Sequence, residues 1–251
     1  SHGRALPDAD YKDVVLPSFD MLPSTAWLDL SEGPVVISVP DTKGRYYVLS
    51  LVDMWTDVFA VIGKRTTGTG RANYAIVPPG WNGTIPQGMR RLDATTAVVW
   101  ANAHIQADSA TDYKTVHAIQ DGFLITPLSQ WNRPPQSFQV KSDPGLDMRT
   151  PPLEQVEKMS ADVFFNYAAE LSRKHPPHAT DQPMLARLKR LNFTYGQQLN
   201  FSKLDGSTQQ VLRRAARAGN EYMHEKMRNI APVRNGWQMD TDIAGVYGNA
   251  Y

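Results

Sequence analysis

The stretch that decides the fold runs from Ala26 to Gly70 and reads AWLDLSEGPVVISVPDTKGRYYVLSLVDMWTDVFAVIGKRTTGTG. It holds short apolar runs rich in β-branched residues. Two turn-forming segments separate these runs, Glu32-Gly33-Pro34 and Asp41-Thr42-Lys43-Gly44. Glycine takes the positive φ that tight hairpin turns require. The stretch therefore predicts β-strands joined by short turns.

The strand pattern continues to about Val140. Strands are expected over residues 35–39, 45–52, 58–63, 74–77, 95–103 and 122–126. A short helix over 110–121, capped by Asp112, is expected among them. Turn signals recur without a long helical pattern, which favours a β-sandwich or jelly roll over alternating β–α units.

The second half of the chain has a helical pattern instead. Helices are expected over 152–174, 182–191 and 207–228, the last of them capped by Ser207. The first helix has an apolar stripe at helical spacing, formed by Val156, Met159, Val163, Phe164 and Tyr167. The third has a stripe formed by Val211, Leu212, Ala215, Ala218, Tyr222 and Met223.

These patterns divide the chain into five parts. They are an irregular N-terminal segment (1–25), a β-sandwich domain (26–140), a linker (141–151), a helical segment (152–228) and a tail (229–251). The tail mixes aromatic residues with Asn, Gly and Asp, and it has few neighbours in sequence to bury them. We therefore expect Trp237, Tyr247 and Tyr251 to pack against another chain or a following domain.

Composition excludes several kinds of partner and site. The 251 residues carry a net charge of +1, without the concentrated basic face that binds phosphate backbones, so no nucleic-acid partner is expected. No apolar run approaches the roughly 18 residues that span a bilayer. The sequence has no cysteine, which excludes disulfides and thiolate chemistry. The six histidines show no chelating pattern, so neither a metal nor another cofactor is expected.

The polar loop over 64–70 is the first candidate site. Lys64 and Arg65 supply positive charge, Thr66 and Thr67 supply hydroxyls, and the glycines leave backbone N–H groups able to face a ligand. Such a loop could hold a carboxylate or a phosphate. The alternative is a hairpin turn with solvated charges.

The DMWTD segment is the second candidate. Asp53, Trp55 and Asp57 alternate, so in a strand they would share one face. Two carboxylates beside an indole could bind a sugar or act as general acid and base. The alternative is a cluster whose carboxylates accept hydrogen bonds from turn N–H groups. The spacing predicts that Asp53, Trp55 and Arg65 line one cavity.

Four tryptophans could offer stacking surfaces for a carbohydrate, with core packing as the alternative. They are Trp27, Trp81, Trp100 and Trp131. We expect Trp81 to be the exposed member of the set, because Pro78-Pro79-Gly80 precedes it.

Several motifs resemble the DUF1254 family. They are Ala26–Leu30, Gly33–Val36, Val39–Tyr47, Gly63–Gly70, Pro79–Trp81, Gln182–Leu188 and Gly236–Trp237. The resemblance covers nearly the whole chain and implies a jelly-roll β-sandwich with a helical insertion, often in exported bacterial proteins. It implies a DUF1214 domain as a common companion, and the segment that ends at Tyr251 resembles the beginning of that domain. It implies no catalytic residues.

The sequence thus predicts a soluble, exported module, periplasmic or secreted after loss of a signal peptide, that binds a small polar or anionic ligand. A cytoplasmic location stays open. One alternative is a hydrolase of a small ester, amide or glycoside that uses Asp53, Asp57 and Arg65. Another is a structural protein that forms a homo-oligomer or is completed by a C-terminal domain.

Overall fold

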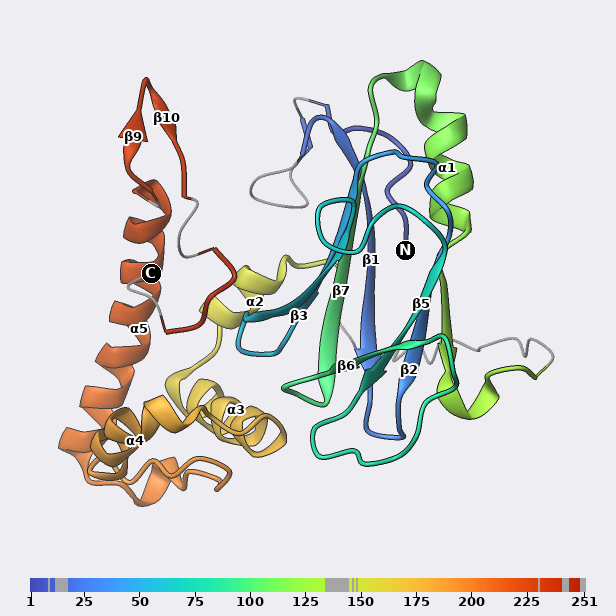
Figure 1. The fold of residues 1–251 in the computed structure, drawn as a ribbon. Coiled ribbons are helices and arrows are strands. Elements are labelled where there is room, and N and C mark those ends of the chain that lie inside the picture. Colours follow the sequence, from blue (N-terminus) through green and yellow to red (C-terminus); the bar gives the residue numbers. More distant parts are fainter. Residues whose placement is uncertain are drawn as a thin grey trace. The chain divides into compact units, whose positions relative to one another are not determined.

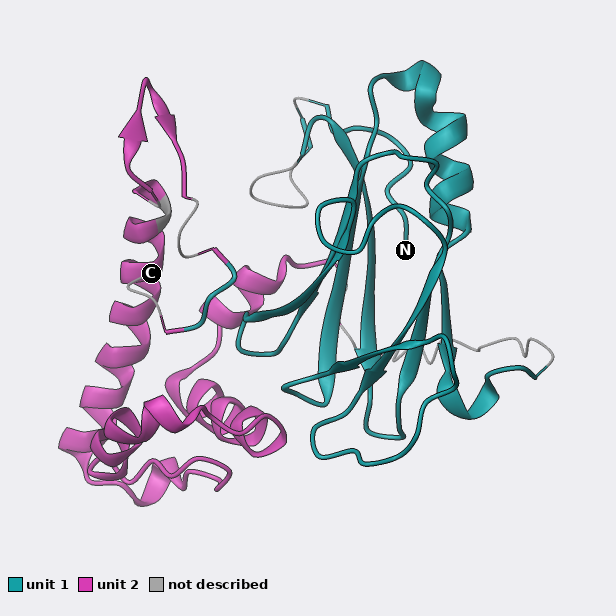
Figure 2. Cartoon of the chain, viewed as in Figure 1, with its two compact units in different colours: residues 1–139, 245–247 teal, residues 140–244, 248–251 magenta. Residues whose placement is uncertain are grey.

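The computed structural model divides the chain into two units (Figure 2). The first comprises residues 1–139 and 245–247, and the second comprises residues 140–244 and 248–251. The described residues are 1–8, 10–11, 18–133, 145, 147, 149–229, 231–240 and 244–248. Most of the expected linker over 141–151 therefore lies outside the described residues.

The first unit contains two four-stranded sheets (Figure 1). Sheet A is antiparallel, and its strands in spatial order are β1 (Met21–Asp29), β7 (Val98–Gln106), β3 (Tyr47–Val52) and β4 (Val58–Gly63). Sheet B consists of β6 (Arg90–Asp93), β5 (Ala72–Val77), β2 (Val35–Val39) and β8 (Leu124–Pro127). In sheet B the β5–β6 pair is parallel and the other two pairs are antiparallel.

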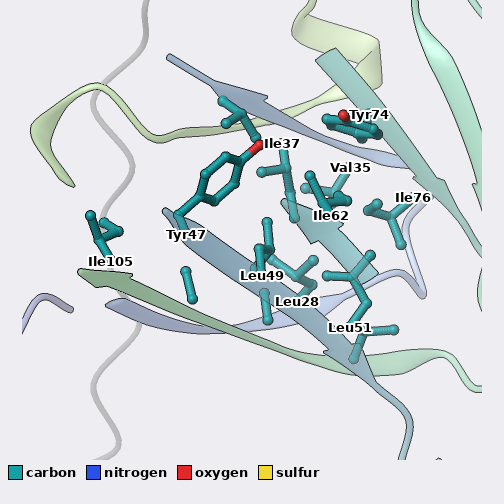
Figure 3. Packing of buried hydrophobic residues seen from close by; sticks show 14 of the residues in the cluster. Leu28, Val35, Ile37, Tyr47, Leu49, Leu51, Ile62, Tyr74, Ile76 and Ile105 are labelled. Atoms are coloured by element: carbon teal, nitrogen blue, oxygen red, sulfur yellow. The ribbon is translucent and has the colours of Figure 1, made fainter. Parts of the chain in front are cut away.

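The core lies between the inner faces of these sheets. Alternate residues of β3 and β7 point inward, so Tyr47, Leu49 and Leu51 are at most 2% exposed. Ile37 and Ile76 of sheet B belong to the same buried cluster, part of which is shown in Figure 3. Each such side chain contributes about 1.5–3 kcal/mol when it leaves water. The predicted β-sandwich is confirmed.

The strand bounds agree with the sequence pattern for some strands and not for others. β2 and β4 have the predicted bounds, whereas β6 was not predicted. β1 begins at Met21, inside the segment expected to be irregular. Pro23 obscures that strand in the sequence, but β1 is a sheet-edge strand, where a missing N–H is tolerated.

The helix predicted over 110–121 is confirmed as a 3₁₀ turn, η1 (Ala110–Asp112), followed by α1 (Tyr113–Asp121). The predicted cap is wrong, since the Asp112 side chain makes no capping hydrogen bond. Its two oxygens bind the Arg45 guanidinium instead. A second 3₁₀ turn, η2 (Leu128–Gln130), follows β8.

The second unit is mainly helical. Its elements are α2 (Pro152–Glu157), α3 (Ala161–Lys174), η3 (Ala179–Asp181), α4 (Gln182–Lys189), η4 (Phe201–Lys203), α5 (Gly206–Arg228) and the hairpin of β9 (Val233–Arg234) and β10 (Trp237–Gln238). The single helix predicted over 152–174 is thus two helices. Asp205, rather than Ser207, caps α5 by accepting a hydrogen bond from the Thr208 N–H (2.9 Å). Among the described helices, none has the length and apolarity needed to cross a membrane.

The apolar stripe predicted for the first helix is wrong at two of its five positions. Val163 is 50% exposed and Tyr167 is 47% exposed. The side of α3 that packs inward carries Phe165, Ala168 and Ala169, which join a small core formed by Phe193, Leu199 and Leu212. Small residues allow close approach between helices, and a search for large apolar side chains overlooks them. In α5, Leu212 is buried, but Val211, Tyr222 and Met223 of its predicted stripe are exposed.

Candidate functional site

The DMWTD segment forms the turn between β3 and β4 and not a strand face. Asp53 is 3% exposed. Its carboxylate accepts hydrogen bonds from the N–H groups of Trp55 (2.8 Å) and Asp57 (3.0 Å) and from the Thr95 hydroxyl (2.7 Å). These bonds make Asp53 a buried acceptor that holds the turn together.

Asp57 and Trp55 hold part of the tail. The Asp57 carboxylate accepts the backbone N–H of Tyr247, and the Trp55 ring meets the Tyr247 ring edge-on with 5.3 Å between centroids. The prediction that Tyr247 packs on another chain is therefore wrong. Trp237 is 73% exposed, and Tyr251 lies outside the described residues.

Backbone N–H groups of the loop after β4 donate hydrogen bonds within the loop itself. The N–H groups of Thr66, Thr67 and Gly68 all donate to the Gly63 carbonyl, at 2.9–3.0 Å. The Thr67 hydroxyl accepts the Gly63 N–H (3.1 Å). These amides are therefore engaged within the turn, although the sequence suggested that they face a ligand.

Arg65 does not meet the DMWTD residues. It is exposed and follows the end of β4, whereas Asp53 and Trp55 precede the beginning of that strand. Six residues of strand separate the two ends by roughly 17 Å. The prediction of one cavity lined by all three is wrong.

Trp81 packs on its own loop. The Arg91 guanidinium lies 5.2 Å from the Trp81 ring centroid, and a Cβ at Gly83 would come within 2.3 Å of that ring. None of the tryptophans is packed in a core. All six lie in the described part of the chain, and none of them is buried.

A polar cleft of about 610 Å³ opens beside Lys64 on the first unit. Its walls come from the β2–β3 turn, the end of β4, the residues after β7, and α1. The residues that line it are Pro40, Asp41, Thr42, Lys43, Gly44, Arg45, Tyr46, Lys64, Gln106, Asp108, Thr115, Ala118 and Ile119.

Thr42 gives the cleft a fixed base. Its side chain is buried, its N–H donates to the Thr69 carbonyl (2.8 Å), and its hydroxyl donates to the Arg45 carbonyl (3.0 Å). These bonds tie the β2–β3 turn to the loop that follows β4. The backbone that carries Lys43 is thereby held in one conformation.

Arg45 and Asp112 form a bidentate ion pair at the wall of the cleft. The two N···O distances are 2.6 and 2.8 Å, and both side chains are more than four-fifths buried. Arg45 also donates to the Gln106 carbonyl (2.9 Å). The guanidinium holds the pKa of the Asp112 carboxyl below its usual value, although burial opposes this effect. The charge of Arg45 is therefore compensated within the fold.

Four further charged side chains line the cleft. Lys64 Nζ donates to the Gly44 carbonyl (2.8 Å) and, as an ammonium group, retains further protons to donate. Lys43 is exposed, and its N–H donates to Asp41 Oδ1 (2.7 Å). Asp108 Oδ1 accepts a hydrogen bond from Gln106 Nε2 (2.9 Å). The ammonium groups suit an anionic group, and the carboxylates suit a hydroxyl or an ammonium group.

Sequence reasoning found Lys64 in this cleft and missed its other charged residues. The run Asp41-Thr42-Lys43-Gly44 was interpreted only as a turn and Arg45 only as the start of a strand, although three of these five residues carry a charge. That concentration of charge in one turn was the available signal. The pairing of Arg45 with Asp112 spans 67 residues, and no local pattern predicts it.

Comparison with known proteins places the cleft in a matched region. The model of the DUF1254 family, described as a protein of unknown function, matches residues 1–127. The crystal structure of the VPA0106 protein from Vibrio parahaemolyticus is similar with a TM-score of 0.61 and 21% identity, covering 84% of this chain and 50% of that one. This chain thus spans about half the length of that structure. No curated protein matches.

Proposed function

The chain belongs to the DUF1254 family, and we propose that it is a binding module whose cleft beside Lys64 takes a small polar ligand carrying an anionic group. The charges of the cleft carry this proposal. Lys43 and Lys64 offer ammonium donors to a carboxylate or phosphate, and Asp41 and Asp108 offer acceptors to its hydroxyl or ammonium groups. A volume of about 610 Å³ lies within the range of small-molecule sites, about 300–1,000 Å³.

The rigidity of the cleft supports the same proposal. Thr42 and the Arg45–Asp112 pair fix the walls before any ligand arrives. A preformed site loses less conformational freedom on binding than a flexible one. The hydrolase alternative has weaker support, because Asp53 and Asp57 are engaged in turn and tail hydrogen bonds and Arg65 lies at the other end of β4.

Calorimetric titration with inorganic phosphate, succinate and glycerol tests the proposal. We expect phosphate or succinate to bind and glycerol to bind far more weakly. Lys43→Ala and Lys64→Ala should each weaken anion binding about tenfold, the equivalent of one charge-assisted hydrogen bond. Lys114→Ala is the matched control, since this exposed lysine of α1 does not line the cleft.

Two results would contradict the proposal. One is the absence of binding heat for both anions at millimolar concentration. The other is an equal loss of affinity in Lys114→Ala and Lys64→Ala, which would indicate general attraction of anions to the surface.

Association with a further domain or a second copy is a second candidate function. Large apolar side chains of the second unit are exposed, among them Tyr222 (71%), Val233 (65%), Trp237 (73%) and Met239 (59%). The match with this chain covers 50% of the similar Vibrio structure. Light scattering should show oligomers that Tyr222→Ser and Trp237→Ser weaken; a monomer at high concentration would count against this candidate.

We also propose an exported location, because the proteins that the chain resembles are often exported.

A further inference from the structure

The outer face of sheet A carries an unusual set of side chains. Alternation sends Thr25 and Trp27 of β1 outward, together with Trp100, Asn102 and His104 of β7. The register places Trp27 opposite Trp100 and Thr25 opposite Asn102. β1 and β7 are long neighbouring strands, as Figure 1 shows. Two indoles and a row of polar side chains thus lie side by side on the face that points away from the core.

A cavity of about 540 Å³ lies over this face and is separate from the cleft beside Lys64. Its floor is formed by Met21, Pro23, Thr25, Trp100, Asn102 and His104, and the N-terminal residues Ser1–Gly3, Ala5, Pro7, Tyr11 and Ser18 complete it. Among these described lining residues there is no Asp, Glu, Lys or Arg side chain. The Ser1 ammonium group also lines the cavity and donates to the Thr25 carbonyl (2.8 Å). A charged ligand would therefore find no side chain of fixed opposite charge, so the cavity suits a neutral one.

Two polar side chains in this cavity are half-buried and have no hydrogen-bond partner in the part of the chain that the structure describes. They are the Asn102 amide and the His104 imidazole. Neither residue contributes a fully buried polar atom without a partner, so these groups are accessible from the cavity and open to a bound molecule. Burial lowers the pKa of His104, so its ring is neutral at pH 7 and offers one donor and one acceptor. The unused donors and acceptors point to a ligand rich in hydroxyl groups.

The Trp100 indole is held in a fixed orientation beside them. Its Nε1–H donates to Thr25 Oγ1 (2.6 Å), and its ring stacks on Trp27 with 5.8 Å between centroids and 18° between planes. Trp27 is 64% exposed, so this stacking leaves much of the aromatic surface in solvent. A rigid indole next to neutral polar groups matches a molecule with one apolar and one polar side.

We propose that this cavity binds a neutral sugar, with a pyranose ring against Trp100 and its hydroxyl groups bonded to Asn102 and His104. The C–H face of a pyranose is flat and apolar, whereas its rim carries hydroxyls that both donate and accept. Trp100, Asn102 and His104 follow each other along β7 over about 13 Å, so a ligand longer than one ring would find contacts along the strand. The site is independent of the proposed anion cleft.

NMR titration of ¹⁵N-labelled protein tests this proposal with methyl β-glucoside, methyl β-galactoside and methyl α-mannoside as probes. At least one glycoside should shift the Trp100 indole N–H and the Asn102 side-chain amide signals. Asn102→Ala should weaken binding about threefold to tenfold, the equivalent of one neutral hydrogen bond, without lowering the melting temperature. Asn73→Ala, on β5 of sheet B, is the matched control and should leave the affinity unchanged.

The Lys64→Ala variant separates the two sites. It should weaken phosphate binding about tenfold and keep the glycoside-induced shifts of Trp100. The proposal is overturned if none of the three glycosides shifts the Trp100 or Asn102 signals at millimolar concentration. It is also overturned if Asn102→Ala binds the shifting glycoside as tightly as the unaltered protein.

Discussion

Asp53 is a buried carboxylate whose hydrogen bonds come from within the fold. Two backbone N–H groups and the Thr95 hydroxyl donate to it, and the Thr95 bond joins positions 42 residues apart. The sequence offered the residue as a general acid or base, because two acids beside a tryptophan also occur in active sites. Its hydrogen bonds indicate a structural role, and that role has a measurable consequence.

Asp53→Ala should lower the free energy of unfolding by about 3 kcal/mol, because it leaves buried donors without an acceptor. Thr95→Ala removes one of the three bonds and should cost about 1 kcal/mol. Urea unfolding followed by tryptophan fluorescence measures both losses. A stable Asp53→Ala protein with impaired ligand binding would show that the carboxylate serves function instead.

Asp112 supports a prediction about pH. Its pairing with Arg45 lowers the pKa of the folded carboxyl below the ordinary value of 3.8, so the folded state binds this proton more weakly than the unfolded state does. The pair therefore stabilises the fold above pH 3.8 and loses its effect as the pH falls through that value toward the folded pKa. Asp112→Asn should cost about 1–2 kcal/mol at pH 7 and make the decline of stability in acid shallower. Urea unfolding between pH 3 and pH 7 measures this difference. A parallel fall in the free energy of unfolding of the unaltered protein and of Asp112→Asn would contradict the prediction.

At the scale of elements, Gly63 joins β4 to the loop that follows it. It has a φ of +156°, and a Cβ there would lie 2.4 Å from the Tyr47 carbonyl oxygen of the neighbouring strand. Gly63→Ala should therefore force the β3–β4 pair apart and destabilise the protein by about 3 kcal/mol or more. Gly70→Ala is the control, because a Cβ at Gly70 meets no atom within 4 Å. Equal melting temperatures for the two variants would mean that the strand pair tolerates the change.

The packing of α3 gives a second prediction at this scale. Phe165 joins the small core of the second unit and meets Phe193 edge-on, with 6.0 Å between ring centroids. Phe165→Ala should cost about 2–4 kcal/mol, whereas Val163→Ala should change stability little because that side chain is half exposed. Circular dichroism at 222 nm during urea unfolding reports on the helices. A larger loss for Val163→Ala would restore the stripe inferred from the sequence.

At the scale of the whole molecule, the sequence predicted what depends on local periodicity. Runs of alternating and β-branched residues located β2 and β4 with their bounds, and turn glycines marked the hairpins between strands. The prediction failed where contacts join distant positions. Asp112 was expected to cap a helix because it precedes a helical pattern, and its true partner, Arg45, lies 67 residues away in sequence. β6 is defined by its pairing with β5 rather than by its composition.

The candidate cleft was also only partly predictable, because it depends on contacts between distant positions. Lys64 was visible in the sequence as a cation next to a glycine-rich loop, but the loop amides turn inward onto Gly63. The cleft exists because folding brings the β2–β3 turn and α1 beside Lys64. Core packing was one interpretation of the four tryptophans, because large apolar residues are usually buried, but the structure buries none of them. The exposed member of the set is Trp27 (64%), whereas the sequence suggested Trp81.

Ligand binding at the cleft is tested most directly by ¹H–¹⁵N NMR of the full chain during titration with inorganic phosphate. We predict saturable shifts confined to the amides of Lys43, Gly44 and Lys64 and their neighbours in the cleft. Lys64→Ala should raise the phosphate concentration at which these shifts saturate about tenfold, while leaving the rest of the spectrum unchanged. Shifts that fail to saturate, or that centre on the basic residues of α5 such as Arg213 and Arg214, would contradict a binding site beside Lys64.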